Sequence, residues 1–192
     1  MSRQRGNRIP NIKAVYFFTE GETEKAYFTK INNEFSNIRI QSFCVRGHGV
    51  KLLEEALSLF DKKKPPLDEK ALSYIIFDND KDHVTKSSYE KAVSEANKKN
   101  FGIGFSNSSF EVWLLAHFEK LGRQVIPQKS LEQKLTNKLG SKYKKADLTQ
   151  IDKIVKSFKI AITNAEHIEE IDFNFQCTNI GKIIKDLKSK YG

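Results

Sequence analysis

The sequence predicts an α/β fold in which helices flank a mostly parallel four-stranded sheet and a helical extension follows at the C-terminal end. Two observations predict this fold. Short apolar runs of strand length alternate with segments of helical spacing over about the first two thirds of the chain, an order that is typical of parallel sheets. The rest has helical spacing, and 192 residues with 39% hydrophobic side chains are enough for one substantial core.

Four apolar runs are the predicted strands, because buried parallel strands are continuously apolar over such lengths. They lie at residues 13–18, 38–45, 74–77 and 101–105. Helices are predicted between and after them, from the Thr19–Glu24 segment to about Phe35, then at 50–60, 87–99, 110–121, 128–139, 150–166 and 178–190. The predicted organisation is a basic N-terminal arm at 1–12, a core at 13–125 and a basic helical subdomain packed on the core at 126–192.

Acidic residues follow three of the predicted strands. Glu20 stands at the end of the first strand, Asp78 and Asp80 at the end of the third, and Glu111 beyond the fourth. Because the carboxyl ends of parallel strands meet at one edge of a sheet, we expect these carboxylates to converge, and Glu24 can face the same edge from one helical turn further on. Such carboxylates repel one another unless a cation lies between them, and oxygen ligands favour Mg²⁺ or Mn²⁺.

Structural alternatives exist for these acids. Aspartates are also favoured in solvated turns, so a D-x-D pair alone is a weak signal. Thr19 with Glu22, and Ser108 with Glu111, have the spacing of capping boxes, in which the side chains bond to the first turn of a helix. For Glu22 the capping role is the preferred interpretation.

Two histidines near these segments are predicted to be structural. His117 lies on an apolar helical stripe, which favours a packed core histidine over a ligand. His48 lies in the turn Arg46-Gly47-His48-Gly49 and is not assigned to the site. The glycines of this turn allow a phosphate to approach the backbone, and Arg46 can pair with that phosphate.

The net charge of +9 is unevenly distributed along the chain. Residues 1–13 carry +4, residues 14–119 carry −2, and residues 120–192 carry +7. An acidic centre between basic segments suits a metal-dependent enzyme that acts on a polyanion. Lys142, Lys144 and Lys145 surround Tyr143 and are candidate contacts to nucleic-acid phosphates, with the aromatic ring available for stacking. A solvated basic surface is the alternative.

The composition gives no sign of a membrane protein, a secreted protein or a P-loop nucleotide-binding protein. No apolar run approaches the roughly 20 residues of a membrane span, and the N-terminus lacks the apolar stretch of a signal peptide. We therefore expect a cytoplasmic protein without membrane contacts. Cys44 and Cys177, which form no C-x-x-C pair, suit a reducing compartment. The sequence contains no Walker loop.

Three motifs resemble those of known proteins. Thr19–Glu24 resembles the E-G-x-x-E motif that opens a Toprim domain, and Phe77–Asp80 resembles its D-x-D motif. Ser106–Phe118 closely resembles the S-N-P-x-F-E-x-W-L-L-x-H-F signature of RloB-like proteins, small Toprim-like proteins tied to bacterial restriction loci and abortive phage infection. Lys142-Tyr143-Lys144 and Cys177-Thr178-Asn179 resemble weaker motifs of that family, so the resemblance spans most of the chain from about residue 13. Ser108 departs from it by replacing the usual proline.

The resemblance implies a Toprim-like, Rossmann-like fold, a divalent cation, Mg²⁺ or Mn²⁺, and phosphodiester chemistry on DNA or RNA. By that analogy the catalytic residues are Glu20, Asp78, Asp80 and Glu111, and the metal ligands are Glu20, Glu24, Asp78 and Asp80. The implied function is that of a nuclease in anti-phage defence, with nucleic acid and an ATPase or another defence-system protein as partners. Since Toprim sites serve several reactions, a non-catalytic module that binds nucleic acid or a partner is the alternative.

Overall fold

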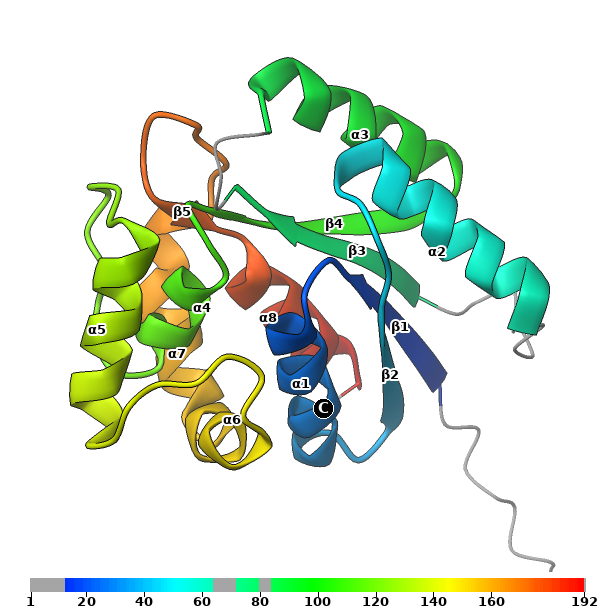
Figure 1. The fold of residues 1–192 in the computed structure, drawn as a ribbon. Helices are drawn as coiled ribbons and strands as arrows, with labels where there is room; N and C mark the ends of the chain where they lie inside the picture. Colours follow the sequence, from blue (N-terminus) through cyan, green and yellow to red (C-terminus); the bar gives the residue numbers. More distant parts are fainter. Residues whose placement is uncertain (1–12, 64–71, 80–83, 192) are drawn as a thin grey trace, which may run out of the picture.

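The structure of the protein is a computed structural model that describes residues 13–63, 72–79 and 84–191. The basic arm at 1–12 and Asp80 lie outside the described residues. At the centre is a five-stranded sheet in the order β2-β1-β3-β4-β5, in which the first four are parallel and β5 is antiparallel to β4 (Figure 1). The strands are β1 (Lys13–Thr19), β2 (Ile38–Cys44), β3 (Leu72–Asp78), β4 (Phe101–Asn107) and β5 (Cys177–Thr178).

Eight α-helices and two 3-10 turns lie in the described part of the chain. They are α1 (Glu22–Ile31), η1 (Asn32–Glu34), α2 (Gly49–Lys63), α3 (Lys86–Lys98), α4 (Glu111–Ala116), α5 (Gln128–Leu139), α6 (Leu148–Val155), α7 (Phe158–Ala165), η2 (Glu166–Ile168) and α8 (Ile180–Tyr191). This arrangement confirms the predicted α/β class and is consistent with a Rossmann-like fold. None of the helices described combines the length and the apolar composition needed to cross a membrane.

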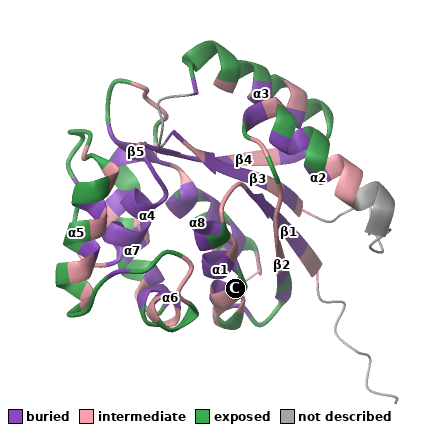
Figure 2. Ribbon diagram, in the orientation of Figure 1, coloured by how far each residue is buried: buried purple, intermediate pink, exposed green. Residues whose placement is uncertain are grey.

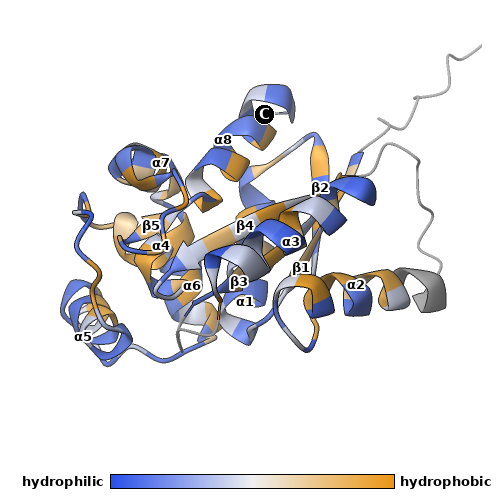
Figure 3. Cartoon of the chain, turned by 90° about the horizontal axis from the view of Figure 1, so that it is seen from above, coloured by the Kyte–Doolittle hydropathy of each residue, from blue (hydrophilic) through white to orange (hydrophobic). Residues whose placement is uncertain are grey.

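Neighbouring side chains of each strand point to opposite faces of the sheet. Apolar side chains lie on both faces, so the sheet is part of two apolar clusters. On β1, Val15 and Phe17 face α1 and the C-terminal helices, whereas Tyr16 and Phe18 face α2 and α3. Figure 2 shows mostly buried residues along β1, β3 and β4, between these two layers, with exposed residues on the outer sides of the helices. Figure 3 shows hydrophobic residues along the strands. This double burial explains why the strands are apolar runs in the sequence.

The C-terminal region packs on the sheet through the same apolar core. Helix α8 lies against β4, α5 and α7 lie against α4, and α6 lies against α1. Lys13 on β1 donates a hydrogen bond of 2.9 Å to the Tyr191 hydroxyl, which joins the two ends of the described chain. The domain boundary predicted at residue 125 stays a prediction.

Several details differ from the expected elements. The helix expected at 110–121 ends at Ala116, and the helix expected to continue to about Phe35 ends at Ile31 and is followed by η1. The fifth strand, β5, was absent from the four-stranded prediction, because two residues carry no apolar run. The helix expected at 150–166 is two helices, α6 and α7, separated at Ser157. The Ser157 hydroxyl lies 3.0 Å from the Ile154 carbonyl oxygen and 3.2 Å from that of His117, and a serine that bonds to nearby carbonyls competes with helical hydrogen bonding.

Candidate functional site

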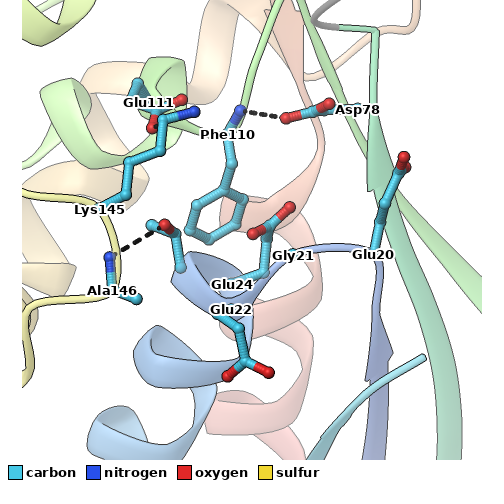
Figure 4. Close-up of a pocket in the computed structure, with 10 residues that line it drawn as sticks. Glu20, Gly21, Glu22, Glu24, Asp78, Phe110, Glu111, Lys145 and Ala146 are labelled. Atoms are coloured by element: carbon cyan, nitrogen blue, oxygen red, sulfur yellow. Dashed lines mark hydrogen bonds and ion pairs between the residues drawn. The ribbon is translucent and has the colours of Figure 1, made fainter. Parts of the chain in front are cut away.

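A cavity of about 360 Å³ lies at the carboxyl edge of the sheet, where β1 and β3 end and α1 and α4 begin (Figure 4). It is lined by Glu20, Gly21, Glu22, Thr23, Glu24, Asp78, Phe110, Glu111, Lys145 and Ala146. We call it the acidic pocket. The lining includes Glu20, Glu24, Asp78 and Glu111, four of the carboxylates that the sequence places at strand ends, and they come from three separate segments of the chain.

The end of β1 holds the first of these carboxylates at the edge. The Glu20 backbone N–H donates to the Ile76 carbonyl of β3 at 3.0 Å, so Glu20 continues the strand by one residue. Gly21 follows as the N-cap residue of α1. A β-carbon at Gly21 would overlap the Glu24 carboxylate, so a larger residue at this position would require that carboxylate to shift.

Glu24 has a strongly perturbed carboxyl group. It is 5% exposed, and burial raises its pKa to about 7. A backbone hydrogen bond opposes this shift, the charges of Glu111 and Glu20 raise the pKa further, and Lys145 lowers it. Carboxylates crowded in this way favour a nearby cation.

Asp78 and Glu111 are held by hydrogen bonds from neighbouring segments. The Phe110 backbone N–H donates to Asp78 Oδ2 at 2.9 Å. The Tyr143 hydroxyl donates to Glu111 Oε1 at 3.2 Å. Burial, and then the charge of Glu111, raise the pKa of Tyr143 above its ordinary value, so its hydroxyl remains a donor.

Neither capping box forms. The Thr19 hydroxyl donates to the Gly21 carbonyl at 2.9 Å, and the N-cap of α1 has no side-chain hydrogen bond. The Ser108 hydroxyl donates to the Ile126 carbonyl at 3.0 Å, and Glu111 is turned into the acidic pocket. The capping interpretation was therefore wrong for both glutamates. Glu22 instead pairs with Lys25 at 2.9 Å on the surface.

The basic segment at 142–145 is divided between the pocket and the surface. The Lys145 ammonium lies 3.7 Å from Glu111 Oε1, so the carboxylates do have a compensating cation, which the motifs alone did not reveal. Tyr143 is only 6% exposed, which contradicts the stacking role predicted for its ring. Lys142 and Lys144 are exposed, as is Arg46 in the turn after β2. Their contacts to nucleic acid stay predictions.

Sequence reasoning missed His48 as a neighbour of the pocket. Its Nδ1 lies 3.7 Å from Glu20 Oε1. A signal was present, because the turn that carries His48 follows β2, which lies beside β1 in the sheet, and parallel strands end at the same edge.

His117 is confirmed as a packed core histidine. It is 3% exposed, and burial lowers its pKa to about 4. Its Nδ1 lies 3.0 Å from the Trp113 carbonyl oxygen, which can only accept, so Nδ1 carries the proton. Nε2 then accepts from the Tyr27 hydroxyl at 3.1 Å.

A family model described as RloB-like protein matches residues 15–187, which is nearly the whole chain. The chain belongs to the RloB-like family. This match confirms the resemblance seen in the sequence motifs. Searches of curated proteins and of solved structures found no match.

Two of the RloB-like motifs join the C-terminal region to the edge of the sheet. The hydroxyls of Ser106 and Thr178 lie 2.9 Å apart, across β4 and β5. The Asn179 side chain accepts from the Phe105 N–H at 2.8 Å and donates to the Ile103 carbonyl at 3.0 Å, as a neighbouring strand would. These motif residues are therefore structural in this RloB-like chain.

The oxygen donors of the acidic pocket fit a hard divalent cation such as Mg²⁺ or Mn²⁺. Over 13–63, 72–79 and 84–191, no three His, Cys, Asp or Glu side chains are arranged to enclose a metal ion. Mg²⁺ keeps several waters and takes one or two protein carboxylates, so a partly hydrated ion suits such an open arrangement. Asp80, the remaining predicted ligand, lies outside the described residues.

Proposed function

We propose that this RloB-like chain is a Toprim-type, metal-dependent nuclease that cleaves phosphodiester bonds of DNA or RNA, tRNA included, in the cytoplasm. One observation carries the proposal: Glu20, Glu24, Asp78 and Glu111 reach a single pocket at the carboxyl edge of the sheet. An anti-phage role, with an ATPase or another defence protein as partner, is proposed from the resemblance to proteins of restriction and abortive-infection loci.

Mg²⁺ or Mn²⁺ would be held by Glu20, Glu24 and Asp78, together with Asp80. When bound, the ion supplies charge stabilisation at the phosphate and a more acidic water. The protein contributes orientation. Phe110 holds the Asp78 carboxylate through its N–H, and Tyr143 holds that of Glu111.

Proton transfer is assigned to the Glu20 end of the pocket. The Glu20 carboxylate is the proposed acid or base, and His48, whose Nδ1 lies 3.7 Å from Glu20 Oε1, can hold that carboxylate in position. Lys142, Lys144 and Arg46 are exposed and would contact phosphates away from the reacting bond.

Cleavage of defined substrates tests the proposal. The purified chain is incubated with labelled single-stranded DNA, duplex DNA, RNA and tRNA in Mg²⁺, Mn²⁺ or EDTA. Cleavage should require the metal and fall by at least about 100-fold in Glu20→Gln, the order of effect of a general acid or base. Glu54→Gln, which removes an exposed acid on α2, is the matched control. Binding of nucleic acid without cleavage in any condition would support the non-catalytic module instead.

A further inference from the structure

We propose that Lys145 is a built-in counter-ion of the acidic pocket: its ammonium pairs with Glu111 when no divalent cation is bound, opposes the entry of that cation by charge repulsion, and shifts toward Glu132 when the cation binds. This inference rests on the proposed function, because it concerns the same metal. It assigns to Lys145 a role in controlling metal occupancy, in place of the general phosphate contact expected from the sequence.

Two carboxylates share the Lys145 ammonium, and their surroundings differ. Its Nζ lies 3.7 Å from Glu111 Oε1 and 3.7 Å from Glu132 Oε1. The Glu111 side chain is 3% exposed and lines the pocket, whereas that of Glu132, on α5, is 37% exposed. Of these two carboxylates, Glu111 lies inside the pocket and Glu132 outside it, and Figure 4 shows the Lys145 ammonium beside Glu111.

The backbone around Lys145 is fixed, so movement would be confined to its side chain. The Ala146 N–H donates to the Thr23 hydroxyl of α1 at 3.1 Å, and the Lys144 N–H donates to Gln150 Oε1 at 2.9 Å. Ala146 has φ +58°, a left-handed conformation that is uncommon for a residue other than glycine. The Lys145 side chain is half exposed, at 51%, and can rotate between its two partners.

Electrostatics explains why the Lys145 ammonium and a divalent metal ion would oppose each other in the pocket. A buried carboxylate such as Glu111 is costly without a paired positive charge, which Lys145 supplies. The same positive charge repels a divalent cation entering the pocket, and at a few ångströms this repulsion is substantial in a partly buried site. Glu132 offers Lys145 a second anion, which makes its departure from Glu111 less unfavourable.

Calorimetric titration of the substrate-free full chain with Mn²⁺ tests the competition. Lys145→Met keeps the aliphatic stem and removes the charge, so the Kd for Mn²⁺ should fall about tenfold, the order expected for one unit charge in a half-exposed site. Glu132→Gln removes the outer partner and should raise the Kd several-fold. The matched controls are Lys129→Met, an exposed lysine on α5, and Glu119→Gln, which pairs with Lys134 and Lys138. Both controls should leave the Kd within about twofold of the wild-type value, because they lie outside the pocket lining.

The outcomes distinguish failure of this inference from failure of the proposed function. An unchanged or raised Kd in Lys145→Met overturns the inference, while Mn²⁺ binding by the wild type leaves the proposed function standing. Absence of Mn²⁺ binding in both proteins overturns both. If Lys145→Met does not fold, Glu132→Gln decides alone: a Kd equal to that of Glu119→Gln overturns the inference.

Discussion

The backbone N–H of Phe110 donates a hydrogen bond of 2.9 Å to Oδ2 of Asp78, which joins the end of β3 to the start of α4 at the acidic pocket. The carboxylate proposed to hold a metal therefore also supports the fold. Substitutions that keep or remove its acceptor oxygen should separate these two roles.

We expect Asp78→Asn and Asp78→Ala to differ in stability. The amide oxygen of Asn can still accept from the Phe110 N–H, whereas Ala leaves that donor without its acceptor, at a cost of about 1–3 kcal/mol. Urea denaturation in EDTA measures the free energy of unfolding of both variants. Equal destabilisation of the two would show that the hydrogen bond contributes little.

Asn179 should be important for stability because its side chain bonds to two backbone groups of β4. Asn179→Ala leaves the Phe105 N–H and the Ile103 carbonyl without these partners, and we expect a loss of about 2–4 kcal/mol. Asn179→Asp keeps the acceptor for the Phe105 N–H but sets a charged carboxylate oxygen against the Ile103 carbonyl, so it should also be less stable than wild type. An Ala variant as stable as wild type in the same denaturation experiment would contradict this.

The buried His117 predicts a dependence of stability on pH. Its pKa is lowered from 6.5 to about 4 by burial, so between these values the unfolded chain binds more protons than the folded one. Stability due to this group is complete above pH 6.5 and is lost as pH falls toward 4, by at most about 3 kcal/mol.

His117→Gln provides the comparison that isolates this effect. Glu24, whose pKa is raised to about 7, acts in the opposite direction over an overlapping range. Glu24 is present in both wild type and His117→Gln, so its contribution cancels in the difference between their free energies of unfolding. This difference should shrink from pH 7 to pH 4. Parallel curves would mean that the histidine is not buried in its neutral form.

The predicted strands were correct because a parallel sheet buried on both faces requires continuous apolar runs, such as the one that ends at Asp78. The convergence of Glu20, Asp78 and Glu111 was also predictable, since it follows from topology. The side-chain hydrogen bonds were not. Thr19 and Ser108 have the spacing of capping residues, yet each bonds to another carbonyl, because tertiary packing decides which acceptor a hydroxyl reaches.

The placement of the basic segment could not be predicted either. Charge counting assigns Lys142, Lys144 and Lys145 to one surface, because it does not show which side chain faces the core. In the structure Tyr143 is buried, the half-exposed Lys145 lines the acidic pocket, and Lys142 and Lys144 lie on the surface. Likewise β5 depends on the pairing of Thr178 with Ser106, far away in sequence.

Lys142 and Lys144 provide a test of nucleic-acid binding. If both contact phosphates, the Lys142→Ala and Lys144→Ala double variant should bind oligonucleotides more weakly, and the slope of log K against log salt should become shallower by about one for each lost contact. Fluorescence anisotropy at several salt concentrations measures this slope. A slope equal to that of wild type would identify the two lysines as a solvated surface.

The acidic pocket is proposed to hold a divalent cation, and thermal melting with Mg²⁺ and with EDTA measures whether it does. Free Mg²⁺ at 100-fold above its Kd should stabilise the wild type by about 2.7 kcal/mol, which raises the melting midpoint by roughly 5–10 °C. Asp78→Asn and Asp80→Asn should lose most of this rise. They should melt in EDTA at or above the wild-type temperature, because they relieve carboxylate repulsion. A wild-type midpoint that does not respond to Mg²⁺, or an equal rise in both variants, would contradict the account.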